Sequence, residues 1–196
     1  MRARMIEYSR KTGETDIAIG LCIDGSGRSV IDTGVGFMDH LLATLALHAR
    51  FDLELSCRGD LHVDDHHTVE DCGLALGAAL DKALEERRGI ARFGWALVPM
   101  DEALARAVVD LSGRPFARVR LGLKGPKIGA LSCENIEHFV RSFATAGRFC
   151  IHLDVIRGAN DHHRAEAAFK AAALALRAAV AGTGTGEAPS LKGTLV

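Results

Sequence analysis

The chain has 196 residues, enough for one domain or two small halves with a buried core. Hydrophobic residues make up 48% of it and charged residues 25%, as in ordinary globular proteins, and the net charge of −1 predicts neither a nucleic-acid-binding nor a membrane-binding surface. No apolar run could cross a bilayer, no signal peptide is recognisable and the five scattered cysteines lack Cys-x-x-Cys spacing, so we expect a cytoplasmic protein with reduced thiols.

The first half of the chain alternates strand-like and helix-like patterns. Apolar and polar residues alternate along residues 16–24, as in a strand with one buried face. The Ser26-Gly27 pair that follows predicts a hairpin to the next strand. In chain order we expect strands at 4–10, 16–24 and 28–33, a helix at 36–50, a strand at 51–57 and a helix from 66 to about 87.

The second half repeats this order. The segment Asp110-Leu111-Ser112-Gly113-Arg114 echoes Asp24-Gly25-Ser26-Gly27-Arg28. Its expected elements are strands at 92–100, 103–110 and 148–153, a glycine-rich loop at 124–129, a helix that carries His138 and ends near 148, and a helix at 162–181. We therefore predict an α+β tandem duplication of a βββαβα unit, with halves at 1–88 and 89–181 and a tail at 182–196. The halves are expected to pack through their helices, which would bring the helices that begin at 66 and 162 together.

A doubled histidine motif opens the last helix of each half. It reads His66-His67-Thr68-Val69-Glu70 in the first half and His162-His163-Arg164-Ala165-Glu166 in the second. Helical residues four apart share a face, whereas neighbours point about 100° apart. The first histidine and the glutamate of each copy can therefore bind one ion, and the second histidine must point elsewhere.

Two matched ligand sets follow when the upstream histidines are added. The sets are His40, His67, His162 and Glu166, and His66, Glu70, His138 and His163. Three imidazoles and one carboxylate leave positions free on a six-coordinate ion, as in catalytic sites. This donor chemistry suits Mn, Fe, Co, Ni or Zn. A single histidine near a helix start is more often a core or capping residue, but the duplication favours metal ligands. The sequence leaves open whether the sites form within one chain or between chains.

Two other functions remain open at this point. One is a dinuclear metal hydrolase, although metals that share a water in such enzymes usually share a carboxylate as well, and each set has only one. The other is a non-enzymatic oligomer whose metals only join subunits, which would predict closed coordination.

Several segments distributed along the chain carry a more specific pattern. They are Gly36-Phe37-Met38-Asp39-His40-Leu41, His66-His67-Thr68-Val69-Glu70-Asp71, Ser112-Gly113-Arg114-Pro115, His138-Phe139-Val140-Arg141-Ser142-Phe143, His162-His163-Arg164-Ala165-Glu166-Ala167-Ala168-Phe169-Lys170 and Ser190-Leu191-Lys192-Gly193-Thr194-Leu195. Together they closely resemble the imidazoleglycerol-phosphate dehydratase family over nearly the whole chain. The resemblance implies halves of the ribosomal protein S5 domain 2-like fold, two Mn²⁺ ions per active site, and a shell of 24 subunits with the metals between chains.

The resemblance also implies a reaction. Water is eliminated from imidazole glycerol phosphate to give imidazole acetol phosphate, in histidine biosynthesis. The departing hydroxyl is on the carbon next to the ring, whereas the departing hydrogen is on an unactivated carbon. If metals hold the ring as imidazolate, its electrons can expel the hydroxide, which gives a diazafulvene-like intermediate with an acidic neighbouring C–H. Two ions, one on each ring nitrogen, would stabilise this charge.

Residue roles follow by matching the family's motifs. The implied catalytic residues are Glu14, His40, His67, Glu70, His162 and Glu166. Glu14 matches a carboxylate that contacts the substrate and transfers a proton. The substrate's phosphate needs fixed cationic and hydrogen-bond donors, and the matching positions are Arg92, Arg114, Lys170, Ser190, Lys192 and Gly193. The tail is expected to become ordered when substrate binds. Asp101 and Glu102 lie at a strand start, with no role assigned.

Overall fold

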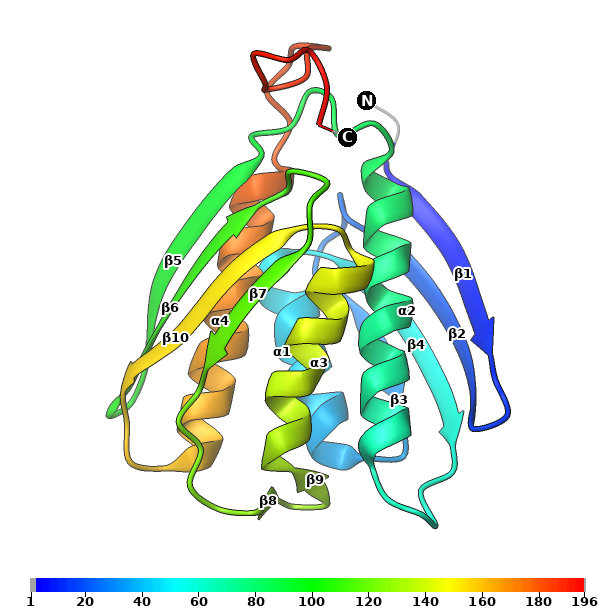
Figure 1. Ribbon diagram of the computed structural model, residues 1–196, viewed down its shortest axis with the longest axis vertical. Helices are drawn as coiled ribbons and strands as arrows, with labels where there is room; N and C mark the ends of the chain where they lie inside the picture. The colour runs from blue at the N-terminus through cyan, green and yellow to red at the C-terminus, as the bar shows by residue number, and fades with distance from the viewer. Residues whose placement is uncertain (1–2, 196) are drawn as a thin grey trace.

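Four helices lie between two four-stranded sheets in the computed structural model, which describes residues 3–195 (Figure 1). The elements of the first half are β1 (Met5–Lys11), β2 (Thr15–Cys22), β3 (Ser29–Asp32), α1 (Gly36–Ala49), β4 (Asp52–Gly59) and α2 (His66–Leu84). Those of the second half are β5 (Phe93–Met100), β6 (Ala103–Asp110), β7 (Phe116–Arg120), β8 (Lys127–Ile128), β9 (Leu131–Ser132), α3 (Cys133–Ala146), β10 (Cys150–Arg157) and α4 (Asp161–Val180). The glycine-rich loop expected at 124–129 instead contains β8, which pairs with β9 in a short hairpin.

The two sheets have the same topology. Their strand orders are β1-β2-β4-β3 and β5-β6-β10-β7, and in each the edge pair, β3 with β4 or β7 with β10, is parallel. The α+β duplication is therefore confirmed. The hairpin expected at Ser26-Gly27 is wrong, because β4 lies between β2 and β3. Asp52 at the start of β4 accepts hydrogen bonds from the backbone N–H groups of Ser26, Gly27 and Arg28, which directs the chain to the far edge.

Each helix packs against a helix of the other half. Among the helices, the main partner of α2 is α3, and that of α4 is α1. The expectation that the two helices with doubled histidines face each other is wrong: α1 and α3 lie between α2 and α4 (Figure 1). The α2–α3 approach is close because of two glycines. A Cβ at Gly77 would lie 2.5 Å from the carbonyl oxygen of Phe143, and one at Gly73 would lie 2.9 Å from that of Phe139.

Replacing Gly77 by alanine is expected to lower the free energy of unfolding by about 1–3 kcal/mol, the usual cost of overpacking. Alanine normally favours a helix by about 1 kcal/mol over glycine, but the added methyl would collide with the α3 backbone. Urea-induced unfolding would measure the change. Gly36→Ala is the matched control, since nothing lies within 4 Å of a Cβ built there. Equal stabilisation of both variants would contradict the close approach.

Two further features concern the chain as a whole. All five cysteines are free thiols, and four of them are buried. Among residues 3–195, no helix combines the length and the apolar character that crossing a membrane would require.

Candidate metal centres

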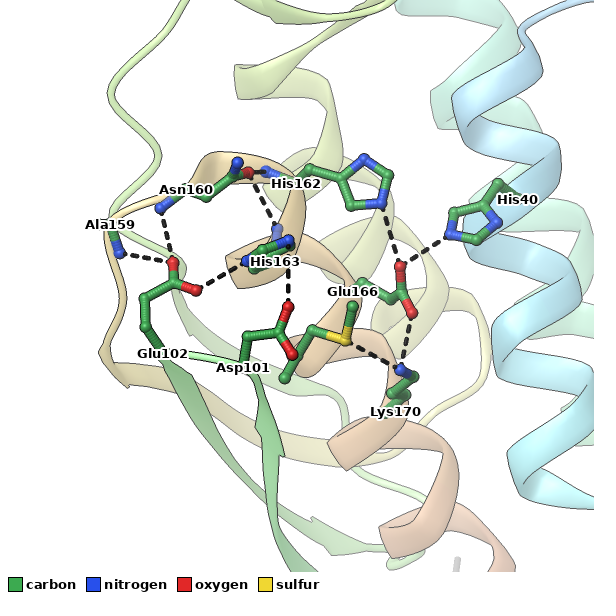
Figure 2. Close-up of polar contacts among 10 residues, drawn as sticks. His40, Asp101, Glu102, Ala159, Asn160, His162, His163, Glu166 and Lys170 are labelled. Carbon is green, nitrogen blue, oxygen red and sulfur yellow. Dashed lines mark hydrogen bonds and ion pairs between the residues drawn. The ribbon is translucent and has the colours of Figure 1, made fainter.

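The first cluster joins α1 and α4 near the start of each helix. Glu166 Oε2 lies 3.0 Å from His40 Nε2 and 3.1 Å from His162 Nε2 (Figure 2). The i, i+4 spacing puts His162 and Glu166 on one face of α4, and the packing of α1 brings His40 to that face. The carboxylate is mostly buried, whereas the two imidazoles are nearly half exposed. The cluster is therefore open on its histidine side.

The second cluster joins α2 and α3 in the equivalent way. Glu70 lies 3.2 Å from His138 Nε2 and 3.9 Å from His66 Nε2. The rings of His66 and His138 stack, with centroids 4.9 Å apart. Asn135 is 3% exposed, and its Oδ1 lies 3.1 Å from His66 Nδ1, so the amide fixes that ring. Each cluster thus takes two ligands from one half of the chain and one histidine from the other half.

Both clusters fit a six-coordinate metal ion. Ligand atoms about 2.1 Å from one ion lie about 3 Å apart at adjacent octahedral positions and about 4.2 Å apart at opposite ones. The three ligand atoms of each cluster lie within 4.8 Å of one another, so small side-chain shifts would bring them onto a common ion. Imidazole and carboxylate donors without thiolate suit first-row transition ions such as Mn²⁺. Three donors leave further positions for another ligand and a substrate.

The second histidine of each doubled motif lies outside its expected cluster. His67 Nδ1 is 3.0 Å from Asp60 Oδ2, and its Nε2 is 3.6 Å from Glu14 Oε1. Figure 2 shows that His163 turns away from His162 and Glu166. Within one chain, then, the structure assembles three members of each expected set of four and leaves His67 and His163 apart.

The electrostatics of the first cluster keep its carboxylate ionised. Burial alone would raise the pKa of Glu166, but hydrogen bonds from Lys170, His40 and His162 lower it to about 2. Lys170 Nζ lies 2.7 Å from Glu166 Oε1 and 3.3 Å from Met100 Sδ. Lys170 was expected at the phosphate of the substrate, and in this structure it is a direct partner of a candidate metal ligand.

Polar side chains next to the histidine motifs hold the N-terminal ends of the helices in place, and the motif spacing does not reveal them. Asp65, directly before α2, accepts hydrogen bonds from the backbone N–H and hydroxyl of Ser132, directly before α3. Burial alone would raise the pKa of Asp65, but these bonds lower it. Asp161 accepts from the N–H groups of Lys124 and Gly125, and Asn160 caps α4. The contacts of Asp65 and Asp161 are long-range, so no local pattern could have identified them, whereas an asparagine directly before a helix is a local capping signal.

Most of the expected phosphate-binding residues gather at the tail. Arg92, Arg114, Ser190 and Lys192 line a cavity of about 740 Å³. Arg92 is held by Asp110, at 2.7 Å, and donates to the carbonyl oxygen of Pro189. The remaining expected residue of the tail, Gly193, donates its N–H to the Ser190 carbonyl in a tight turn.

This tail cavity and the two clusters lie at opposite ends of the molecule. α4 starts beside the first cluster and ends just before the tail (Figure 1). A helix of 20 residues is about 30 Å long. The tail packs against the body of the chain through the Gly89–Glu187 backbone hydrogen bond and the buried Leu195. Within one chain, a small molecule cannot touch both ends.

Comparisons with known proteins agree on one family. The sequence profile described as "Imidazoleglycerol-phosphate dehydratase" matches residues 33–176. Relatives of similar sequence carry the same name, among them proteins from Kluyveromyces lactis and Phytophthora nicotianae. The one from Kluyveromyces lactis is 50% identical over 96% of this chain and 96% of its own length. The one from Phytophthora nicotianae is 56% identical over 98% of this chain, which spans only 42% of that relative's length.

Two solved structures resemble this chain over most of its length. The imidazoleglycerol-phosphate dehydratase of Staphylococcus aureus subsp. aureus N315 is 36% identical, with a TM-score of 0.82, over 91% of this chain and 100% of that chain. The Pyrococcus furiosus structure, described as IGPD in complex with (S)-C348, is 34% identical, with a TM-score of 0.82, over 95% of this chain and 99% of that chain.

Proposed function

This chain belongs to the imidazoleglycerol-phosphate dehydratase family, and we infer from that membership that it removes water from imidazole glycerol phosphate, giving imidazole acetol phosphate in histidine biosynthesis. The observation that carries the inference for this chain is the pair of three-ligand clusters, related by the duplication and open to a further ligand. When bound, two Mn²⁺ ions would act as Lewis acids that stabilise charge on the imidazole ring. The five free thiols suit a cytoplasmic location, which we also propose.

We propose that each metal site is shared between chains. His67 of one copy would complete the cluster of His40, His162 and Glu166 in another. His163 would complete the cluster of His66, Glu70 and His138. Support comes from the partners of both histidines within the chain, because His67 pairs with Asp60 and His163 with Glu102, and neither ring joins a cluster. Such exchange of ligands links copies into a closed assembly, and the family resemblance favours a shell of 24 subunits.

The substrate site would likewise combine different copies. Three carbons join the imidazole to the phosphate in this substrate, a span far shorter than α4. The clusters of one chain would therefore bind the ring, while Arg92, Arg114 and Lys192 of another would bind the phosphate. A phosphate there would also compete with Asp110 for Arg92.

Removing the charge of Lys192 is expected to lower kcat/KM by roughly 10- to 100-fold, since a hydrogen bond to a charged group contributes about 1.5–3 kcal/mol. Lys192→Ala should raise KM and lower kcat together, because binding at the phosphate positions the reacting end. Steady-state kinetics with imidazole glycerol phosphate would measure both. Lys11→Ala is a control, since Lys11 is an exposed lysine that pairs with Asp16 far from the tail. Wild-type kinetics for Lys192→Ala would remove the tail from the substrate site.

Glu14 would transfer a proton, either to the departing hydroxyl or from the adjacent carbon. It lies in the β1–β2 turn, and its carboxylate faces His67 Nε2. Glu14→Gln is expected to lower kcat by roughly 10²- to 10⁴-fold, the usual contribution of a general acid or base. Metal content and particle mass should stay unchanged. An active Glu14→Gln enzyme would contradict this role, and loss of activity with intact assembly would reject the alternative of a non-enzymatic oligomer whose metals only join subunits.

A direct assay tests the reaction itself. Purified protein with imidazole glycerol phosphate and Mn²⁺ should form an enolisable ketone and leave the phosphate ester intact. Release of inorganic phosphate without the ketone would instead support the metal hydrolase alternative.

A further inference from the structure

His67 and His163, the histidines outside the clusters, each pair with a carboxylate in the same geometry. Asp60 Oδ2 is 3.0 Å from His67 Nδ1, and Glu102 Oε2 is 2.7 Å from His163 Nδ1. On the opposite edge of each ring, Nε2 lies 3.6 Å from Glu14 and 3.7 Å from Asp101, beyond hydrogen-bonding distance. Both rings therefore use Nδ1 within the chain and leave Nε2 without a hydrogen bond.

The shared arrangement is not a simple product of the duplication. Asp60 lies in the connection between β4 and α2, whereas Glu102 lies in the turn between β5 and β6. The counterpart of that turn in the first half is the β1–β2 turn, which carries Glu14. The two halves thus reach one ring orientation from different places in the fold, which points to a requirement on the rings themselves.

The carboxylate determines which ring nitrogen can bind a metal. An ionised carboxylate only accepts hydrogen bonds, so Nδ1 must carry the hydrogen, and Nε2 is the nitrogen available to an ion. Glu102 is well suited to this, because its Oε1 accepts from the backbone N–H groups of Asn160 and Ala159 while Oε2 faces the ring (Figure 2). These two backbone hydrogen bonds hold the carboxylate in place beside the His163 ring.

Asp60 has little other structural use. Its Oδ1 is buried and has no hydrogen-bond partner among residues 3–195, an arrangement that costs free energy. Its Oδ2 contacts His67. A carboxylate retained in such a place is best explained by its action on the ring.

We propose that Asp60 and Glu102 are positioning residues that orient His67 and His163, so that each presents Nε2 to the metal cluster of another copy. The inference rests on the proposed sharing of metal sites between chains. Metal-binding histidines commonly donate their other ring N–H to a carboxylate, and loss of that partner weakens metal binding roughly 10- to 100-fold.

The test is Mn²⁺ binding by the full-length protein, measured by equilibrium dialysis with metal analysis. Glu102→Gln should weaken one of the two ions per chain roughly 10- to 100-fold and leave the other unchanged, and Asp60→Asn should weaken the other one. In Glu102→Gln, the backbone N–H groups retain the amide oxygen, so the amide NH₂ faces Nδ1 and favours the wrong tautomer. Glu86→Gln is the control, because Glu86 is 77% exposed and far from both rings.

A variant in which one cluster is already disabled shows which ion each carboxylate affects. Glu70→Gln removes a ligand from the cluster that His163 would complete. In that background, Asp60→Asn should still weaken the remaining ion, whereas Glu102→Gln should have no further effect. If both variants weakened both ions together with the thermal stability of the chelated protein, the carboxylates would be holding the fold and the inference would be wrong.

Direct replacement of the rings separates this inference from the proposed function. If His67→Ala and His163→Ala leave Mn²⁺ binding unchanged, sharing of the metal sites fails and this inference fails with it. If those variants weaken binding but Asp60→Asn and Glu102→Gln do not, only the positioning role is overturned.

Discussion

Glu166→Gln is expected to lower kcat/KM by more than about 100-fold. The loss of a partner beside a metal ligand already costs roughly 10- to 100-fold, and Glu166 is a proposed ligand itself. Its Oε2 contacts both histidines of the first cluster and its Oε1 contacts Lys170, so glutamine would remove the negative charge at the centre of all three contacts. Kinetics at increasing Mn²⁺ concentration would show whether the defect is in metal binding or in turnover.

The same variant should lose about half of the bound metal. Only one of the two clusters contains Glu166, so the cluster of His66, Glu70 and His138 should keep its ion. Metal analysis after gel filtration would measure the Mn²⁺ content per chain. Glu86→Gln again serves as the control, because it makes the same chemical change at an exposed position. Full metal content and near-normal activity in Glu166→Gln would show that Glu166 is not a ligand.

Removal of metal is expected to dissociate the assembly into smaller species. If each cluster takes its fourth ligand from another chain, the free energy of metal binding contributes directly to association. Light scattering before and after treatment with a chelator would measure the particle mass. Mn²⁺ added in excess of the chelator should prevent the change, and later addition should reverse it.

The opposite outcome would be equally informative. A protein with no remaining Mn²⁺ that kept its full particle mass would show that other surfaces hold the copies together. His67→Ala combined with His163→Ala should reproduce the effect of the chelator, because it removes both ligands that a chain would lend to its neighbours.

The sequence predicted which three side chains come together in each cluster, for a physical reason. The i, i+4 spacing of His162 and Glu166 puts both on one helical face whatever the helix packs against, and the duplication identified the matching pair in the first half. The upstream histidines, His40 and His138, could each be assigned to the doubled motif of the other half of the chain, because the two halves have the same order of elements.

The arrangement of the helices could not be predicted in the same way. An apolar helical face shows that a helix is buried but not which neighbour buries it. The pairing of α2 with α3 depends on the fit of Gly73 and Gly77 against the α3 backbone, which exists only in the folded chain. Asp60 and Glu102 were likewise missed as partners of His67 and His163, because each contact joins a side chain to a ring outside any recognisable motif.

The separation between the tail cavity and the two clusters has a consequence for inheritance. On the proposed arrangement, every act of catalysis uses the helix starts of one polypeptide and the tail of another. A cell that expresses two alleles of this gene would build particles from both kinds of chain. In such a particle, a mutation at one end of one chain would inactivate an active site that also contains residues of an unmutated chain. Two gene products damaged at opposite ends could, in the same particle, still form some complete centres.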